Sequence, residues 1–101
     1  MDISSNISGS TATIVLPEKF DLTCRTAFHQ LSTALLGNPE LKSIQIDLAH
    51  TRYLDSSALG MLLLLKTKAE ENSKEVALTH CQEPVREILT IASFDQFFSI
   101  T

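Results

Sequence analysis

The chain has 101 residues, of which 44% are hydrophobic and 20% are charged, with three Gly and three Pro. This length suits one domain with a single hydrophobic core, and the composition excludes the disordered and fibrous classes. We therefore expect one domain over residues 1–101. The formal net charge of −4 excludes direct nucleic-acid binding as a favoured function, because such affinity depends on clustered Lys and Arg.

The sequence shows no signal for export or membrane insertion. Residues 1–5 lack the basic start and apolar core of a signal peptide, and the longest unbroken apolar run, residues 61–65, is too short to span a bilayer. We expect a cytoplasmic protein without membrane insertion. Cys24 and Cys81 form no CxxC pair, which favours two reduced, buried thiols over a redox or zinc site. The three His are scattered, so no metal or other cofactor is expected.

Strand signals occur four times along the chain. Alternating apolar and polar residues, or enrichment in β-branched residues, predict strands over residues 3–6, 11–16, 43–48 and 76–79. The turn composition of Ser8-Gly9-Ser10 predicts that the first two strands form a hairpin, and Pro17 ends the second. The alternation within 43–48 is typical of a strand that is buried mainly on one face. Residues 50–54 are expected to form a loop that leads to the next helix.

Helical periodicity occupies the segments between these strands. Apolar residues at helical spacing predict a first helix that ends before Gly37, a second over residues 57–71, and a third that starts near Pro84. Asp21 or Thr23 is available to cap the first helix. The apolar and aromatic segment 92–100 is expected to dock as a last short strand or helix. This order predicts an α/β fold, with a mixed sheet of four or five strands and helices packed on it.

The stretch from Leu54 to Gly60 is the most informative part of the sequence. Two adjacent hydroxyls, Ser56 and Ser57, follow Asp55 where the second helix begins. A Ser oxygen there can cap the helix by accepting a hydrogen bond from a free amide of the first turn. A phosphate is also favoured there, because free amides and the positive end of the helix dipole point toward it. The residues alone leave open which of the two hydroxyls caps the helix and which would take a phosphate.

The second helix is apolar nearly all round in its first two turns. At about 100° per residue, Ala58, Leu62 and Leu65 fall on one face, whereas Leu63 and Leu64 do not. Either neighbouring elements cover the surplus leucines, or they form an exposed patch that receives a partner. A phosphate beside such a patch would add about −1.5 to −2 charges and oppose docking. The partner-binding residues predicted on this ground are Asp55, Ser56, Ser57, Leu59, Gly60, Leu63 and Leu64.

Two segments, Ile46-Asp47-Leu48 and Tyr53 to Gly60, resemble the STAS domain family, named for sulfate transporters and anti-sigma-factor antagonists. The resemblance extends over nearly the whole chain and implies a single STAS-like domain. In members that act as anti-sigma-factor antagonists, the Ser directly after the motif Asp is phosphorylated, which corresponds to Ser56 here. The resemblance therefore implies that Ser56 is the phosphate acceptor, and we expect Ser57 to be the helix cap, with the exchange of these roles as the alternative. Asp21 falls where those members carry an acidic residue after their second strand, which adds Asp21 to the predicted partner-binding residues. Ala58 departs from the family, because many members have Gly at that position.

The resemblance implies a set of protein partners. The unphosphorylated domain would bind an anti-sigma factor that is also a Ser protein kinase, and a PP2C-type phosphatase would reverse the modification. The alternative is a constitutive STAS subunit of a membrane-associated lipid or anion transport complex. An enzyme is not expected, because the sequence has no G-x-S-x-G elbow and no recognisable Ser/His/Asp arrangement. We expect a monomer or weak dimer.

Overall fold

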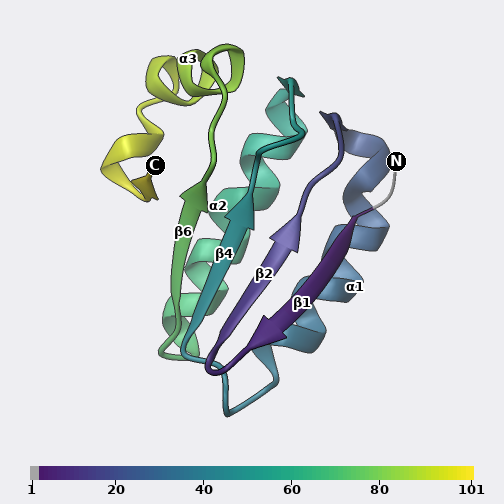
Figure 1. The fold of residues 1–101 in the computed structure, drawn as a ribbon, viewed down its shortest axis with the longest axis vertical. Coiled ribbons are helices and arrows are strands. Elements are labelled where there is room, and N and C mark those ends of the chain that lie inside the picture. The colour runs from purple at the N-terminus through teal and green to yellow at the C-terminus, as the bar shows by residue number, and fades with distance from the viewer. Residues whose placement is uncertain (1–2) are drawn as a thin grey trace.

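A computed structural model describes residues 3–101. In it, a five-stranded mixed sheet forms one layer of the protein (Figure 1). β1 runs antiparallel to β2, and all the other neighbouring strands of this sheet are parallel. The predicted α/β fold with a mixed sheet is confirmed. In spatial order the strands are β1 (Ser4–Ser8), β2 (Thr11–Val15), β4 (Ser43–Asp47), β6 (Glu75–Thr79) and β7 (Ser99–Ile100).

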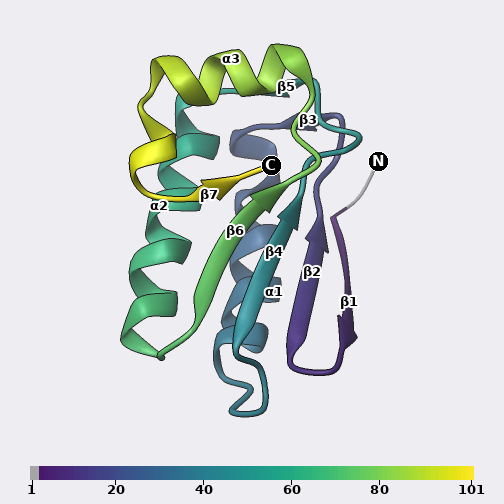
Figure 2. The ribbon, with the colours of Figure 1, turned by 60° about the vertical axis from the view of Figure 1, so that its left-hand side comes forward.

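Two helices, α1 (Arg25–Leu36) and α2 (Ser56–Glu71), lie side by side on one face of the sheet (Figures 1 and 2). The alternation along β4 explains why only one face is covered: Ile44 and Ile46 are fully buried, whereas Gln45 between them is exposed. The expectation of a strand buried mainly on one face is confirmed. Neither helix, nor any other within residues 3–101, has the length and apolar character needed to cross a bilayer.

The hairpin at the start of the sheet follows the predicted pattern. β1 extends to Ser8, which pairs with Thr11, so the loop consists of Gly9 and Ser10 alone. Gly9 has φ +62°, a left-handed conformation that glycine adopts without strain and that two-residue hairpin loops require. The hairpin prediction is therefore confirmed.

The carboxyl ends of the parallel strands are covered by elements that the sequence pattern predicted only in part. β3 (Lys19–Phe20) and β5 (Tyr53–Leu54) form a separate parallel pair, and β5 runs beneath α3 (Glu83–Ile91), which lies across this end (Figure 2). Residues 50–54 were expected to be a loop, and this expectation is wrong for Tyr53 and Leu54. The pair is held by burial of one residue from each strand, Phe20 and Leu54.

Segment 92–100 was expected to form a last short strand or helix, and it contains one of each. A short 3-10 helix, η2 (Phe94–Gln96), follows α3 and leads into strand β7. Phe94 and Phe98 are buried, and their rings stack with centroids 5.5 Å apart. Burial of these aromatic rings docks the segment, because large apolar side chains gain the most from leaving water.

The two cysteines are free thiols in different surroundings. Cys81 is buried, and burial raises the pKa of its thiol, although the nearby Arg86 guanidinium opposes this shift. Cys24 belongs to η1 (Leu22–Cys24), a short 3-10 helix that leads into α1, and it is only half-buried. Its Sγ donates a hydrogen bond to the carbonyl of Lys19 at 3.6 Å. The prediction of buried thiols is confirmed for Cys81 and wrong for Cys24.

Candidate functional site

Asp55 caps α2. Its Oδ1 accepts a hydrogen bond from the amide of Ala58 at 2.8 Å, and its backbone is extended, as in most N-cap residues. Ser56 and Ser57 are the first two residues of the helix itself. The prediction that Ser57 is the cap is therefore wrong. Asp is as good a cap residue as Ser, and Asp55 holds the position directly before the first helical turn.

The second oxygen of Asp55 joins α2 to the segment after β3. Asp55 Oδ2 accepts a hydrogen bond from the amide of Leu22 at 3.3 Å. Asp21 caps η1 in turn, because its Oδ1 accepts a hydrogen bond from the next amide, that of Thr23, at 3.0 Å. Asp21 or Thr23 was expected to cap α1. Asp21 instead caps the 3-10 turn that precedes α1, and the N-cap position of α1 is held by Cys24. Asp21, Leu22, Asp55 and Ser56 thus form one edge at the start of α2, which we call the rim.

The rim carries two acidic side chains, Asp21 and Asp55. The Thr23 hydroxyl and amide both donate to Asp21 and hold the pKa of its carboxyl below the usual range. Asp55 is a carboxylate that accepts two amide hydrogen bonds. Leu22 lies between these groups and is 53% exposed. The rim therefore presents an apolar side chain flanked by carboxylates.

The two hydroxyls at the start of α2 differ in accessibility. Ser56 is exposed. Ser57 is half-buried and faces α1, where it lines the space between the two helices. Ser56 is thus the more accessible of the two hydroxyls.

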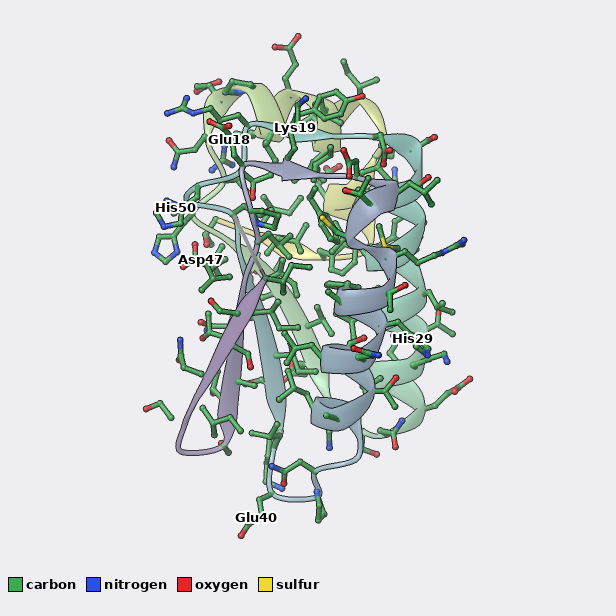
Figure 3. The ribbon with its side chains drawn as sticks, turned by 90° about the vertical axis from the view of Figure 1, so that its right-hand side faces the viewer. Glu18, Lys19, His29, Glu40, Asp47 and His50 are labelled. Carbon is green, nitrogen blue, oxygen red and sulfur yellow. The ribbon has the colours of Figure 1, made fainter. Side chains whose placement is uncertain are left out.

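An open groove of about 610 Å³ runs between α1 and α2. From α2 it is lined by Ser57, Gly60 and Leu64, and this leucine is 52% exposed. From α1 it is lined by Arg25 and His29, and Figure 3 shows His29 where α1 runs beside α2. The groove therefore starts next to the rim and continues along the helix pair.

Charged groups at the carboxyl end of the sheet form separate pairs that are exposed on at least one side. His80 Nδ1 lies 3.3 Å from Asp47 Oδ1, and Arg52 Nε lies 3.9 Å from Glu18 Oε2. Figure 3 shows Asp47 and Glu18 on the side of the sheet away from His29. Exposed pairs of this kind contribute little to stability. Within residues 3–101, no three His, Cys, Asp or Glu side chains gather closely enough to hold a metal ion.

Comparison with known proteins decides the family. A family model described as "Mlab, STAS domain" matches residues 3–100. A STAS-domain containing protein of Pseudomonas aeruginosa is 37% identical over 93 residues, which cover 92% of this chain and 90% of the relative. The chain belongs to the STAS domain family.

Solved structures share the fold of this STAS domain at low sequence identity. An anti-sigma-factor antagonist (STAS) domain protein from Planctomyces limnophilus has a TM-score of 0.85 at 17% identity, with 99% of this chain and 88% of that chain covered. The anti-sigma factor antagonist SpoIIAA in its unphosphorylated form has a TM-score of 0.78 at 14% identity, with 98% and 86% covered. Phosphorylated SpoIIAA, a Bacillus cell fate determinant, has a TM-score of 0.76 at 13% identity, with 98% and 90% covered. A sulfate transporter family protein from Wolinella succinogenes has a TM-score of 0.72 at 12% identity, with 86% and 70% covered.

The STAS domain places the predicted partner-binding residues in three different surroundings. The surplus leucines differ in burial, and whether they receive a partner stays a prediction. Leu59 and Leu63 are partly buried and pack against the core, whereas Leu64 is exposed in the groove. The residues fall into three groups: Asp21, Asp55 and Ser56 on the rim; Ser57, Gly60 and Leu64 in the groove; Leu59 and Leu63 against the core.

Sequence reasoning missed the part of this surface that α1 and η1 contribute. Leu22 has no periodic neighbour that marks it, because η1 is a single short turn. Arg25 and His29 lie on the outer side of α1 and line the groove. One sequence signal was available for them: α1, with the sequence RTAFHQLSTALL, contains no acidic residue in a chain of negative net charge.

Proposed function

We propose that this STAS domain is a phosphorylation-switched anti-sigma-factor antagonist of the cytoplasm. In its unphosphorylated form it binds an anti-sigma factor that is also a Ser protein kinase, and the sigma factor is released. The kinase phosphorylates Ser56, the phosphate blocks binding, and a PP2C-type phosphatase restores the active form. The observation that carries this proposal is the exposed Ser56 hydroxyl at the first position of α2, directly after the cap Asp55.

Accessibility and local bonding support Ser56 over Ser57 as the acceptor. A kinase must reach the hydroxyl, and Ser56 is exposed while Ser57 is half-buried. Both oxygens of Asp55 are already engaged by amides, one from α2 and one from η1. We therefore assign Asp55 to fixing the backbone that presents Ser56, and not to removing its proton.

The position of Ser56 explains how a phosphate would block binding without unfolding the domain. The amides of the first helical turn favour an anion, so the modified helix start stays folded. The phosphate adds about −1.5 to −2 charges to a rim that already carries the carboxylates of Asp21 and Asp55. A partner that docks on the rim must then desolvate this charge, which opposes association.

The first experiment is phosphate mapping. The protein is incubated with ATP and, one at a time, with the anti-sigma factors and Ser kinases of its source organism, and the phosphate is located by mass spectrometry. We expect modification of Ser56, loss of the signal in Ser56→Ala, and an unchanged signal in Ser57→Ala. Phosphate at other residues, with Ser56 unmodified, would contradict the proposal.

Two neighbouring leucines separate binding from stability. Leu64→Lys is expected to change the free energy of unfolding by less than about 0.5 kcal/mol, because the side chain is exposed, and to weaken partner binding about 10-fold. Leu63→Lys is expected to lower the free energy of unfolding by about 1 kcal/mol, because Leu63 packs against the core. Urea unfolding and a binding titration of both variants measure the difference. Unchanged partner binding in Leu64→Lys would place the docking surface elsewhere.

A constitutive STAS subunit of a membrane-associated transport complex is the second candidate. The similarity of fold to a sulfate transporter family protein favours it. In that role the same surface would dock permanently, so Ser56→Asp would leave partner binding intact. Loss of binding in Ser56→Asp therefore distinguishes the switch from the constitutive subunit.

A further inference from the structure

The groove between α1 and α2 is about as long as a three-turn helix. Its α2 side runs from Ser57 to Lys68, which is about 16 Å or three helical turns at 1.5 Å per residue. Met61 and Leu64 give this side an apolar surface, and Phe28 contributes from α1. The groove is open along its length. An elongated apolar surface of this kind matches the apolar face of a helix.

The charge of the groove is opposite to that of the molecule. Its charged lining consists of Arg25, Lys68 and the titratable His29, and none of its lining residues is acidic. The acidic residues of α2 are Glu70 and Glu71, which lie beyond the groove at the end of the helix. The chain as a whole carries a net charge of −4. The groove is therefore complementary to an acidic ligand.

Gly60 deepens the groove at its middle. A Cβ added to Gly60 would meet no atom within 4 Å, so packing inside the domain does not require a glycine there. Glycine in a helix interior costs about 1 kcal/mol relative to alanine. The missing side chain leaves room between Ser57 and Leu64 for a group from another molecule.

We propose that this groove binds an amphipathic α-helix of the partner protein, with acidic side chains beside its apolar stripe. The stripe packs over Gly60 and Leu64, and the acidic groups pair with Arg25 at one end and Lys68 at the other. Cations at both ends favour a helix over a fatty acyl chain, which carries its charge at one end only. The inference deepens the proposed function, and it rests on that function in so far as the helix belongs to the anti-sigma factor.

The test uses a displayed library of 14-residue helical peptides that is selected for binding to the intact protein. We expect the selected peptides to have apolar residues at i, i+3, i+4 and i+7 and an excess of Asp and Glu. Their affinity should fall at least 10-fold for Gly60→Leu, which fills the groove. It should fall about 10-fold for Lys68→Glu and stay unchanged for Lys42→Glu, an exposed lysine that does not line the groove. Thr67→Leu, at an exposed α2 position that does not line the groove, is the control for Gly60→Leu.

Three results would overturn the inference. Selected peptides that bind Gly60→Leu as well as the original protein would lie on another surface. Selected peptides without acidic excess would refute the charge argument. The third result has two forms, and in both of them no peptide is selected. If the protein forms concentration-dependent dimers that Gly60→Leu abolishes, the groove binds a second copy of the chain. If the protein binds myristate and Gly60→Leu abolishes this binding, the groove binds an acyl chain. Phosphate mapping at Ser56 is independent of Gly60→Leu, so the proposed switch and the groove inference can fail separately.

Discussion

Replacement of Ser56 by Asp is expected to weaken binding to the anti-sigma factor at least 100-fold, which corresponds to about 2.7 kcal/mol. The new carboxylate would be the third on the rim, beside Asp21 and Asp55. Docking would bring these charges together in a surface that loses its water, and like charges in that setting cost several kcal/mol. Isothermal titration of the purified partner with each variant measures the change.

Two variants test whether this loss comes from charge at the rim. Ser56→Ala should bind within about threefold of the original protein, because it removes only the hydroxyl. Gln45→Asp introduces the same charge at an exposed position on the open face of the sheet and should also bind normally. Binding of Ser56→Asp at the original affinity would refute the proposed role of the rim.

Asp55→Ala is expected to lower the free energy of unfolding by about 1 to 2 kcal/mol. The substitution leaves the amide of Ala58 without its acceptor, and loss of an N-cap costs about 1 kcal/mol. It also releases the amide of Leu22, which ties η1 to α2. Each kcal/mol corresponds to a drop of about 4–8 °C in Tm for a domain of this size. Thermal and urea unfolding measure the effect.

A conservative substitution separates the cap from the charge of Asp55. Asp55→Asn should lose less stability than Asp55→Ala, because Asn caps helices as well as Asp does. Its amide nitrogen cannot accept the hydrogen bond from Leu22 that Oδ2 accepts, so we expect a loss of about 0.5 to 1 kcal/mol. Asp95→Ala, at an exposed residue of η2, controls for loss of a surface carboxylate and should change the free energy of unfolding by less than about 0.5 kcal/mol. If Asp55→Ala were as stable as Asp55→Asn, the capping hydrogen bond would make no measurable contribution to the free energy of unfolding.

The main strands and helices could be predicted because each repeats its pattern over several residues. β4 shows a clean alternation, and α1 and α2 show helical spacing over three or more turns. The β3–β5 pair could not be predicted, because each strand has two residues and only one buried side chain, Phe20 or Leu54. Its pairing is decided by tertiary contacts.

The sequence indicated where the candidate site lies, at the start of α2, but not the role of each residue in it. Asp55, Ser56 and Ser57 are all good cap residues, and only the observed start of α2 shows which of them precedes the first turn. The different exposure of Leu63 and Leu64 depends on where the rest of the domain packs around α2. The groove is also formed by two helices that are separate in the chain, so its basic lining becomes visible only when α1 is placed beside α2.

The phosphorylation switch is tested most directly by one titration carried out twice on the same sample. Protein that is phosphorylated at Ser56, as verified by mass mapping, is titrated with the anti-sigma factor before and after treatment with a PP2C-type phosphatase. We expect binding at least 100-fold weaker before treatment, and full affinity after the phosphate is removed. Equal affinity before and after treatment would contradict a switch at Ser56.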